Sequence, residues 1–231
     1  METIAICITT HNRSEVLKRS LESWLKFLPD NSETFIVDDA SEVPNGWADF
    51  RFETQQGIAK AKNKCIELAK DFDHIFLVDD DVMPRELGWE KPYIESGINH
   101  LCLTFERNQK GFYPSPSVRK IKDVGDISYY TAPNGCMLYL RKKCVEIAGG
   151  MRPEFGLWGF EHVEYSSRIH AFGLIEHPFM DIKDSLKYFE VLDWSNSVQS
   201  SLSVTDRRTS GKINLALYEK FGIKSEFVEY K

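Results

Sequence analysis

Residues 74–81 read HIFLVDDD, an apolar run that ends in three consecutive aspartates. The apolar part, residues 74–78, is too short for a helix and predicts a buried strand. Similar short runs occur at residues 4–9 and 34–37, and a weaker one occurs at residues 50–53. Continuous apolar strands of this kind are typical of a parallel sheet with both faces covered.

Two amphipathic segments separate these strands. Within residues 14–28 the apolar side chains from Leu17 to Leu28 fall on one helical face, and residues 57–70 have the same character. Alternating strands and helices predict an α/β fold in which helices flank a mostly parallel central sheet.

The second half of the chain has a different pattern. Residues 101–105 and 136–140 predict further strands, which we expect to be antiparallel. Between them, residues 107–126 form a long connection with two prolines and little periodicity, which we expect to order over a bound ligand. Later helices are predicted at residues 159–172 and 213–221.

Size and composition narrow the class of protein. The chain has 231 residues, enough for one domain, and its net charge of −6 argues against a dedicated nucleic-acid binder. No apolar stretch is long enough to span a membrane, and the N-terminus carries no secretory leader. Five scattered cysteines indicate reduced core residues, so we expect a cytoplasmic protein.

Polar residues follow three of the predicted strands. They are Thr9, Thr10, His11, Asn12 and Arg13 after the first strand, Asp38 and Asp39 after the second, and Asp79, Asp80 and Asp81 after the strand at residues 74–78. In parallel sheets, ligands bind beyond the carboxyl ends of the strands. The sequence therefore predicts a ligand site at this rim, although an aspartate pair alone also suits a turn or a helix cap.

The three aspartates favour a metal site. Neighbouring carboxylates repel, and in a crevice they need either a cation or a raised pKa. If the strand continues, Asp79 and Asp81 point to one side and Asp80 to the other. That spacing suits Mn²⁺ or Mg²⁺, which could bridge a diphosphate; the alternative is an exposed acidic turn. The sequence has no glycine-rich phosphate loop, which argues against dinucleotide-binding Rossmann domains and P-loop enzymes.

A second constellation lies in the segment GLWGFEHVEYSSR, residues 156–168. On a helix Glu161, Glu164 and Arg168 share one face, which suits either a surface ion-pair ladder or a pocket wall. The preceding aromatic and glycine residues favour the pocket wall. Either glutamate, or His162 beside them, could act as a general base.

Seven blocks of sequence occur in an order found in a known family. They are ITTHNR, FIVDDAS, QQGIAKAKN, FLVDDD, NGCMLYLRK, AGGMRPEF and WGFEHVEYSSR. This set resembles the GT-A-fold glycosyltransferases, especially family 2, over residues 4–175. The resemblance implies one GT-A domain, with a nucleotide-sugar-binding half at residues 1–100, an acceptor-side half at 101–190 and a C-terminal extension at 191–231.

The resemblance also implies roles for individual residues. Nucleotide-sugar contacts fall to Thr9, Thr10, Asn12, Arg13, Asp38, Asp39, Gly57, Lys62, Asp79 and Asp80. The metal ligands would be Asp79 and Asp81, with His177 as a third. The acceptor side would include Gly149, Gly150, residues 154–159 with Trp158 and Gly159 among them, and Glu164. Glu161 would hold hydroxyl groups of the donor or acceptor.

One departure concerns the catalytic base. The family's usual Glu-Asp pair is here Glu161–His162, so the expected aspartate base is absent. We expect His162 to act as the base and Glu161 to orient the acceptor, with inversion at the sugar. Three alternatives remain: Glu161 is the base, His162 binds the metal, or the reaction retains configuration. Because the two residues are adjacent on a helix, their side chains should point about 100° apart.

The expected function is the metal-dependent transfer of a sugar to a hydroxyl acceptor. The expected donor is a nucleotide-diphosphate sugar, namely a UDP-sugar. A glycan, a lipid-linked sugar, a protein or a modified nucleic acid could supply that hydroxyl. A non-catalytic domain that binds nucleotide sugars or glycans is the alternative. A nucleotidyltransferase would need a basic glycine-rich loop that the chain lacks. The basic residues between Arg107 and Lys122 could approach an anionic acceptor or form a solvated loop.

Overall fold

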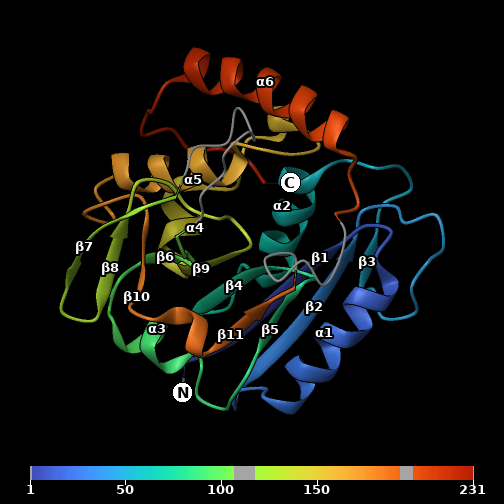
Figure 1. The fold of residues 1–231 in the computed structure, drawn as a ribbon, viewed down its shortest axis with the longest axis horizontal. Coiled ribbons are helices and arrows are strands. Elements are labelled where there is room, and N and C mark those ends of the chain that lie inside the picture. The colour runs from blue at the N-terminus through green and yellow to red at the C-terminus, as the bar shows by residue number, and fades with distance from the viewer. Residues whose placement is uncertain (1, 107–117, 193–199, 231) are drawn as a thin grey trace.

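The computed structural model describes residues 2–106, 118–192 and 200–230 (Figure 1). Its central sheet has six strands in the order β3-β2-β1-β4-β9-β6. The parallel strands are β1 (Ile4–Thr10), β2 (Ser32–Asp38), β3 (Phe50–Arg51) and β4 (His74–Asp79). Strand β9 (Met137–Arg141) runs antiparallel to β4 and to β6 (His100–Cys102), so the expected mixed sheet is confirmed.

Six α-helices surround this sheet in the described part of the chain (Figure 1). They are α1 (Ser14–Lys26), α2 (Ile58–Ala69), α3 (Lys91–Glu95), α4 (Lys142–Ala148), α5 (Glu161–Ala171) and α6 (Val204–Phe221). Helix α2 packs on β1, β2 and β4, whereas α6 lies across one end of the molecule. Helix α6 starts nine residues before the predicted helix because Ser203 caps it, its hydroxyl accepting the Asp206 N–H.

Short strands outside the central sheet were missed by the sequence pattern. Strands β7 (Lys120–Val124), β8 (Ile127–Tyr130) and β10 (Met180–Ile182) form a three-stranded sheet. Strands β5 (Val82–Pro84) and β11 (Phe189–Val191) form a pair, and short 3₁₀ turns occur at η1 (Pro153–Phe155) and η2 (Ser185–Lys187). The end of the expected long connection is therefore a hairpin, and its residues 107–117 lie outside the described residues.

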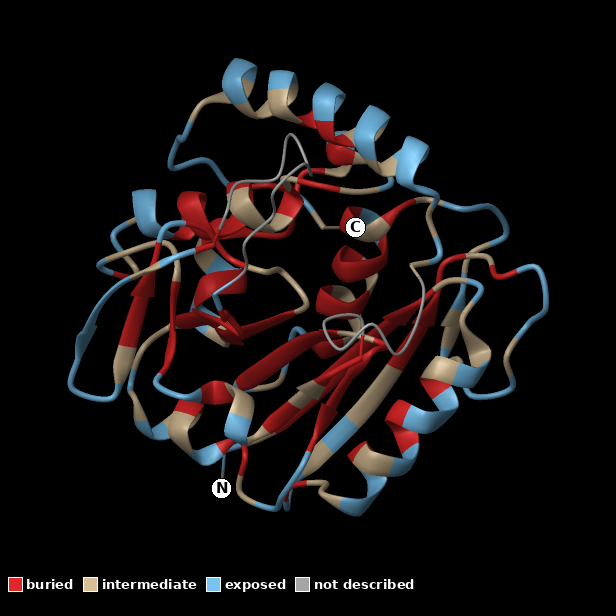
Figure 2. Ribbon diagram, viewed as in Figure 1, coloured by how far each residue is buried: buried red, intermediate tan, exposed pale blue. Residues whose placement is uncertain are grey.

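The core explains why the first strands were predictable. All seven residues of β1 and five of the six in β4 are buried, as expected for strands covered on both faces. Figure 2 shows these strands in the buried interior and the outer side of α6 exposed. All five cysteines are free thiols, as expected. Across the described residues, no helix has the length and apolar character needed to cross a membrane.

Candidate functional site

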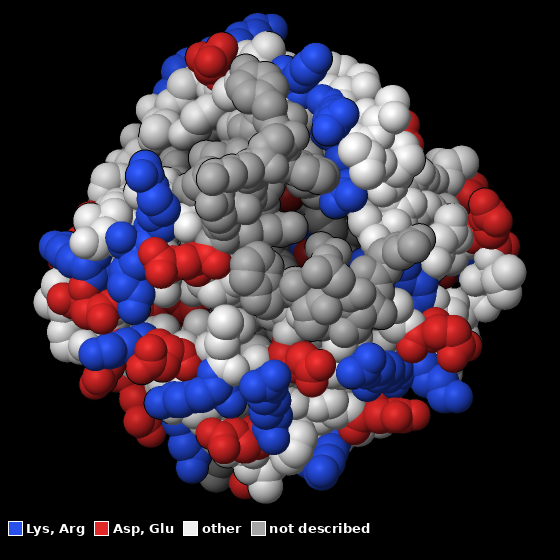
Figure 3. All heavy atoms as spheres, in the orientation of Figure 1, with Lys and Arg blue, Asp and Glu red and all other residues white. Residues whose placement is uncertain are grey.

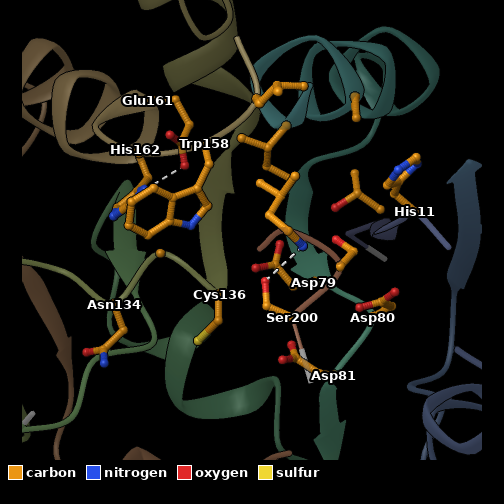
Figure 4. A pocket seen from close by; sticks show the side chains of 18 of the residues that line it. His11, Asp79, Asp80, Asp81, Asn134, Cys136, Trp158, Glu161, His162 and Ser200 are labelled. Atoms are coloured by element: carbon orange, nitrogen blue, oxygen red, sulfur yellow. Dashed lines mark hydrogen bonds and ion pairs between the residues drawn. The ribbon is translucent and has the colours of Figure 1, made fainter. Parts of the chain in front are cut away.

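A cavity of about 260 Å³ lies beyond the carboxyl ends of β1 and β4 (Figure 4). Space-filling atoms show a hollow on the same face, with acidic atoms visible inside it (Figure 3). Its walls include Thr9, Thr10, His11, Arg13, Asp39, Asp79, Asp80 and Asp81 on one side, and Asn134, Gly135, Cys136, Trp158, Gly159, Glu161 and His162 on the other. The polar residues at the strand ends and the segment at residues 156–168 therefore line one cavity.

The three aspartates do not continue a strand. Strand β4 ends at Asp79, and the chain turns through Asp80 and Asp81 before it enters β5. The turn occurs because β5 pairs with β11 and not within the central sheet. The expected alternation of side chains along a strand therefore does not apply beyond Asp79.

Two cationic side chains, Lys62 of α2 and Arg13 at the start of α1, partly neutralise this acidic turn. The Asp79 carboxylate lies 2.6 Å from the Nζ atom of Lys62, a residue that is only 2% exposed. Asp80 is buried and accepts hydrogen bonds from Arg13 and from the Thr10 hydroxyl. Burial alone would lower the pKa of Arg13, but the charges of the three aspartates outweigh it, so this pKa rises and Arg13 stays protonated.

The donor atoms here suit a metal that binds together with a diphosphate. Among the described residues, no group of three or more His, Cys, Asp or Glu side chains could hold a metal alone. Asp79 and Asp81, however, bring hard carboxylate oxygens to the same cavity. Mg²⁺ commonly binds through one or two carboxylates, with substrate phosphates and water completing its shell. The residues therefore fit a divalent cation that enters with its phosphate ligand.

The structure does not bring His177, the expected third metal ligand, to the acidic turn. Its Nε2 atom bonds the Tyr130 carbonyl at 2.9 Å, and its ring packs against Tyr129 and Phe179. These contacts hold His177 against the β7–β8–β10 sheet, and it is not among the described residues that line the cavity.

Asp38 ends β2 and Asp39 follows it, and of the two only Asp39 lines the cavity. Its carboxylate accepts the backbone N–H groups of Gln56 and Gly57 at 2.7 and 2.8 Å. Gly57 has a φ of +90°, and a Cβ there would lie 2.1 Å from the Gly156 carbonyl oxygen, so the position requires glycine. The predicted importance of Gly57 thus arises from a close backbone contact.

Asp38, for which a nucleotide contact was expected, does not line the cavity and instead holds the loop that follows β2. It is fully buried, and it accepts hydrogen bonds from Ser41 and from the Asn45 side chain. Arg51 of β3 also lies 3.6 Å from its carboxylate. Adjacent residues of an extended chain face opposite sides, so only one member of the pair could reach the cavity.

His11 lines the cavity, whereas the predicted Asn12 holds a turn. Asn12 has a φ of 54°, donates its N–H to the Ser41 hydroxyl, and accepts the Glu42 N–H. The Nδ1 atom of His11 lies 2.7 Å from the Asp39 carbonyl oxygen, which places the imidazole beside Asp39. The sequence placed His11 among the rim residues but gave it no individual role, although the corresponding block of the family usually carries a tyrosine at this position.

On the opposite wall, Glu161 and His162 contact each other (Figure 4). The Nδ1 atom of His162 lies 2.8 Å from Glu161 Oε1, although a regular helix would direct neighbouring side chains apart. The contact forms at the first residues of α5, which follow Phe160 with a left-handed φ of 70°. Burial tends to raise the pKa of Glu161, but His162 and the backbone N–H groups of Glu161 and Gly159 outweigh it, so this pKa is lowered.

Other residues expected on the acceptor side lie behind the cavity wall that carries Trp158. Glu164 is 2% exposed and bonds Arg168 and Arg152 at 2.8 and 3.1 Å, so it belongs to a buried ion network. Glu164, expected on the acceptor side, is not among the described residues that line the cavity. Gly149 and Gly150 are covered by the C-terminal segment, because the Gly150 N–H bonds the Val228 carbonyl at 2.8 Å. Trp158 and Gly159 line the cavity as expected.

The C-terminal extension also reaches the cavity, which the sequence did not predict. Ser200, Ser201, Leu202 and Arg207 contribute to its lining. Asn134 and Cys136, from the segment that leads into β9, were likewise missed. No periodicity marks these residues, because loops that approach the site only in the folded chain carry no local signal.

Comparisons with known proteins agree with this geometry. The family model described as glycosyl transferase family 2 matches residues 5–144. A protein of Acanthamoeba polyphaga mimivirus, named uncharacterized glycosyltransferase R363, is 30% identical over 250 residues, which cover 98% of this chain and 94% of that protein.

Two solved structures are similar in fold. The structure of GalNAc-T7 with UDP, GalNAc and Mn²⁺ has a TM-score of 0.60 at 16% identity, covering 79% of this chain and 42% of that one. The mannosyltransferase PcManGT from Pyrobaculum calidifontis, with GDP-Man and Mn²⁺, has a TM-score of 0.57 at 14% identity, covering 79% of this chain and 55% of that one. The chain thus spans about half the length of these solved structures.

The family match covers more than half of the chain, and the viral relative is similar along nearly all of it. The sheet order, the acidic turn after β4 and the cavity at the strand ends are consistent with both findings. The chain is a glycosyltransferase of the GT-A type, and it belongs to glycosyl transferase family 2.

Proposed function

We propose that this enzyme transfers a sugar from a UDP-sugar to a hydroxyl acceptor with the help of a divalent cation, inverting the anomeric centre. The observation that carries the proposal is that the acidic turn and the Glu161–His162 pair line opposite walls of one cavity. A donor diphosphate at the acidic turn would place its sugar between the two walls.

The donor half of the proposal rests on Asp39 and the residues beside it. Each Asp39 oxygen accepts one backbone N–H, and a carboxylate can accept about four hydrogen bonds, so capacity for a base N–H remains. The His11 imidazole provides a flat ring next to it. We propose that this corner holds a uracil ring and that Thr9, Thr10 and Arg13 shape its surroundings.

Charge explains why a cation belongs in the proposal. A diphosphate approaching Asp79, Asp80 and Asp81 would be repelled, since the contacting side chains Lys62 and Arg13 neutralise only part of the negative charge. A divalent cation held by Asp79 and Asp81 would supply the missing positive charge and stabilise the departing diphosphate. Mn²⁺ and Mg²⁺ both match these oxygen ligands.

The acceptor half rests on the contact between Glu161 and His162. An ionised Glu161 favours the His162 tautomer in which Nδ1 carries the proton and donates it to the carboxylate. Nε2 is then the basic atom, and it can take the proton of an acceptor hydroxyl. We therefore propose that His162 is the base and that Glu161 orients it.

The test uses a panel of nucleotide sugars with Mn²⁺ and simple glycosides as acceptors, with released nucleoside diphosphate as the readout. His162→Ala should lower kcat by about 10²–10⁴-fold, the usual contribution of a general base, with little effect on UDP affinity. His177→Ala, which removes a histidine away from the cavity, serves as the matched control. Retained configuration in the product NMR spectrum, or a near-parental rate for His162→Ala, would contradict the assignment. No turnover of any donor would favour a non-catalytic binding domain.

A further inference from the structure

The C-terminal helix α6 packs against the loop that enters α5 (Figure 1). This helix lies beyond residues 5–144, which the family model matches. The loop, residues 155–160, carries Trp158 into the cavity wall and leads directly to Glu161 and His162. Whatever fixes this loop therefore also fixes the proposed base.

One side chain of α6 bonds three backbone carbonyls of the loop. The Nδ2 atom of Asn214 lies 2.5 Å from the Phe155 carbonyl oxygen, 2.8 Å from that of Trp158 and 2.9 Å from that of Gly159. Its two hydrogens are shared among the three carbonyls. The Nδ2 position suits a donor such as the amide NH₂, because an oxygen atom there would face three carbonyl oxygens that carry the same partial negative charge. Asn214 is 2% exposed, so water cannot readily replace it.

Aromatic contacts in the two turns of α6 that follow Asn214 also hold the helix in place, independently of that amide. The ring of Phe160 lies 5.7 Å from that of Tyr218, and the ring of Phe155 lies 6.0 Å from that of Phe221. Hydrophobic packing thus docks the helix, whereas Asn214 defines the path of the loop backbone.

We propose that Asn214 is a positioning residue for the transfer reaction: it fixes the 155–160 loop and thereby sets the position of His162 against the donor. The inference rests on the proposed function of His162. Asn214 does not touch the reacting groups in the structure, and it acts through the three carbonyls. A loop shift of about 1 Å can cost about 10²-fold in rate, so one amide has this leverage.

Two variants of Asn214 test the inference. Asn214→Asp keeps the shape but places oxygens against the three carbonyls, and Asn214→Ala removes the contacts without adding repulsion. Ala216→Asp adds the same acid on the exposed side of α6 and serves as the control. Hydrogen exchange of the unliganded protein, calorimetry with UDP and Mn²⁺, and kinetics with the most active p-nitrophenyl glycoside of the acceptor panel are measured for each.

We expect both Asn214 variants to speed exchange at residues 155–165 at least tenfold and to lower kcat at least tenfold. The affinity for UDP with Mn²⁺ should stay within twofold, and Ala216→Asp should match the parent. Unchanged exchange at residues 155–165 would overturn the inference, as would UDP affinity that falls in step with kcat. If Asn214→Asp does not fold, Asn214→Ala decides. If the parent shows no transfer, the proposed function fails, while hydrogen exchange still tests the anchoring of the loop.

Discussion

Gly135 offers a way to move the proposed base without changing it. A Cβ at this position would lie 2.7 Å from three ring atoms of His162, namely Cγ, Cδ2 and Cε1. The imidazole therefore rests on the bare face of the glycine. Gly135→Ala should push the ring away while leaving Glu161 and every donor-side residue as they are.

The size of the effect follows from two distances. Ordinary van der Waals contact begins at 3.4 Å, so the ring must move by at least 3.4 − 2.7 = 0.7 Å. A misplacement of about 1 Å can cost about 10²-fold in rate, so we expect kcat to fall by about 10–100-fold. Because Gly135 has a φ of +85°, alanine should also cost about 1–2 kcal/mol of stability.

Steady-state kinetics and thermal unfolding separate these two effects. Gly125→Ala is the matched control, because Gly125 has a φ of +58° and a Cβ there would meet nothing within 4 Å, so it shares the backbone strain without the contact. Both variants should lose stability, but only Gly135→Ala should lose kcat, and UDP affinity should stay unchanged in both. A parental kcat in Gly135→Ala would refute the assignment of His162 as a base held by this contact.

Three further predictions concern single carboxylates. Asp81→Asn should sharply reduce turnover and metal-dependent donor binding in a folded protein; full activity in excess chelator would exclude the cation. Asp39→Ala should weaken UDP binding by about 1.5–3 kcal/mol in calorimetry, and tighter binding of GDP than of UDP would contradict the donor class. Burial raises the pKa of Asp181 to about 7 despite its hydrogen bonds to Tyr93 and Thr104. The unfolded chain loses that proton at lower pH, so the free energy of unfolding should fall as the pH rises from about 4 to about 7. Urea titrations at several pH values should find this dependence reduced in Asp181→Asn.

The central sheet was predictable because its strands are buried on both faces. Residues 4–9 and 74–78 are continuous apolar runs, and the structure extends each by one residue into the polar rim. Strands β7 and β10 gave no such signal. In β7 one residue is half-buried and four are exposed, while β10 has only three residues, too few for a period of two to be recognised.

The site was predictable where a residue's position follows from the end of a strand. Asp39 directly follows β2, Asp79 is the last residue of β4, and both line the cavity. Side-chain direction was not predictable, because it depends on contacts between distant segments. Asp38 turns toward Asn45, and Glu164 turns toward Arg152, through hydrogen bonds whose partners the local pattern does not identify.

Helix α6 shows most clearly why part of the site could not be read from the sequence. Its only buried residues within the described helix are Gly211 and Asn214, and both are poor helix formers. Glycine costs about 1 kcal/mol in a helix interior relative to alanine, so local preference argues against a helix here. In the fold, Gly211 faces Gly159, where a Cβ built on Gly159 would lie 3.8 Å from the Gly211 Cα atom. The small residue lets the helix approach the loop, and that approach brings the Asn214 amide within reach of the three carbonyls. The features that weaken α6 as a helix are thus the ones that join it to the cavity wall that carries Trp158.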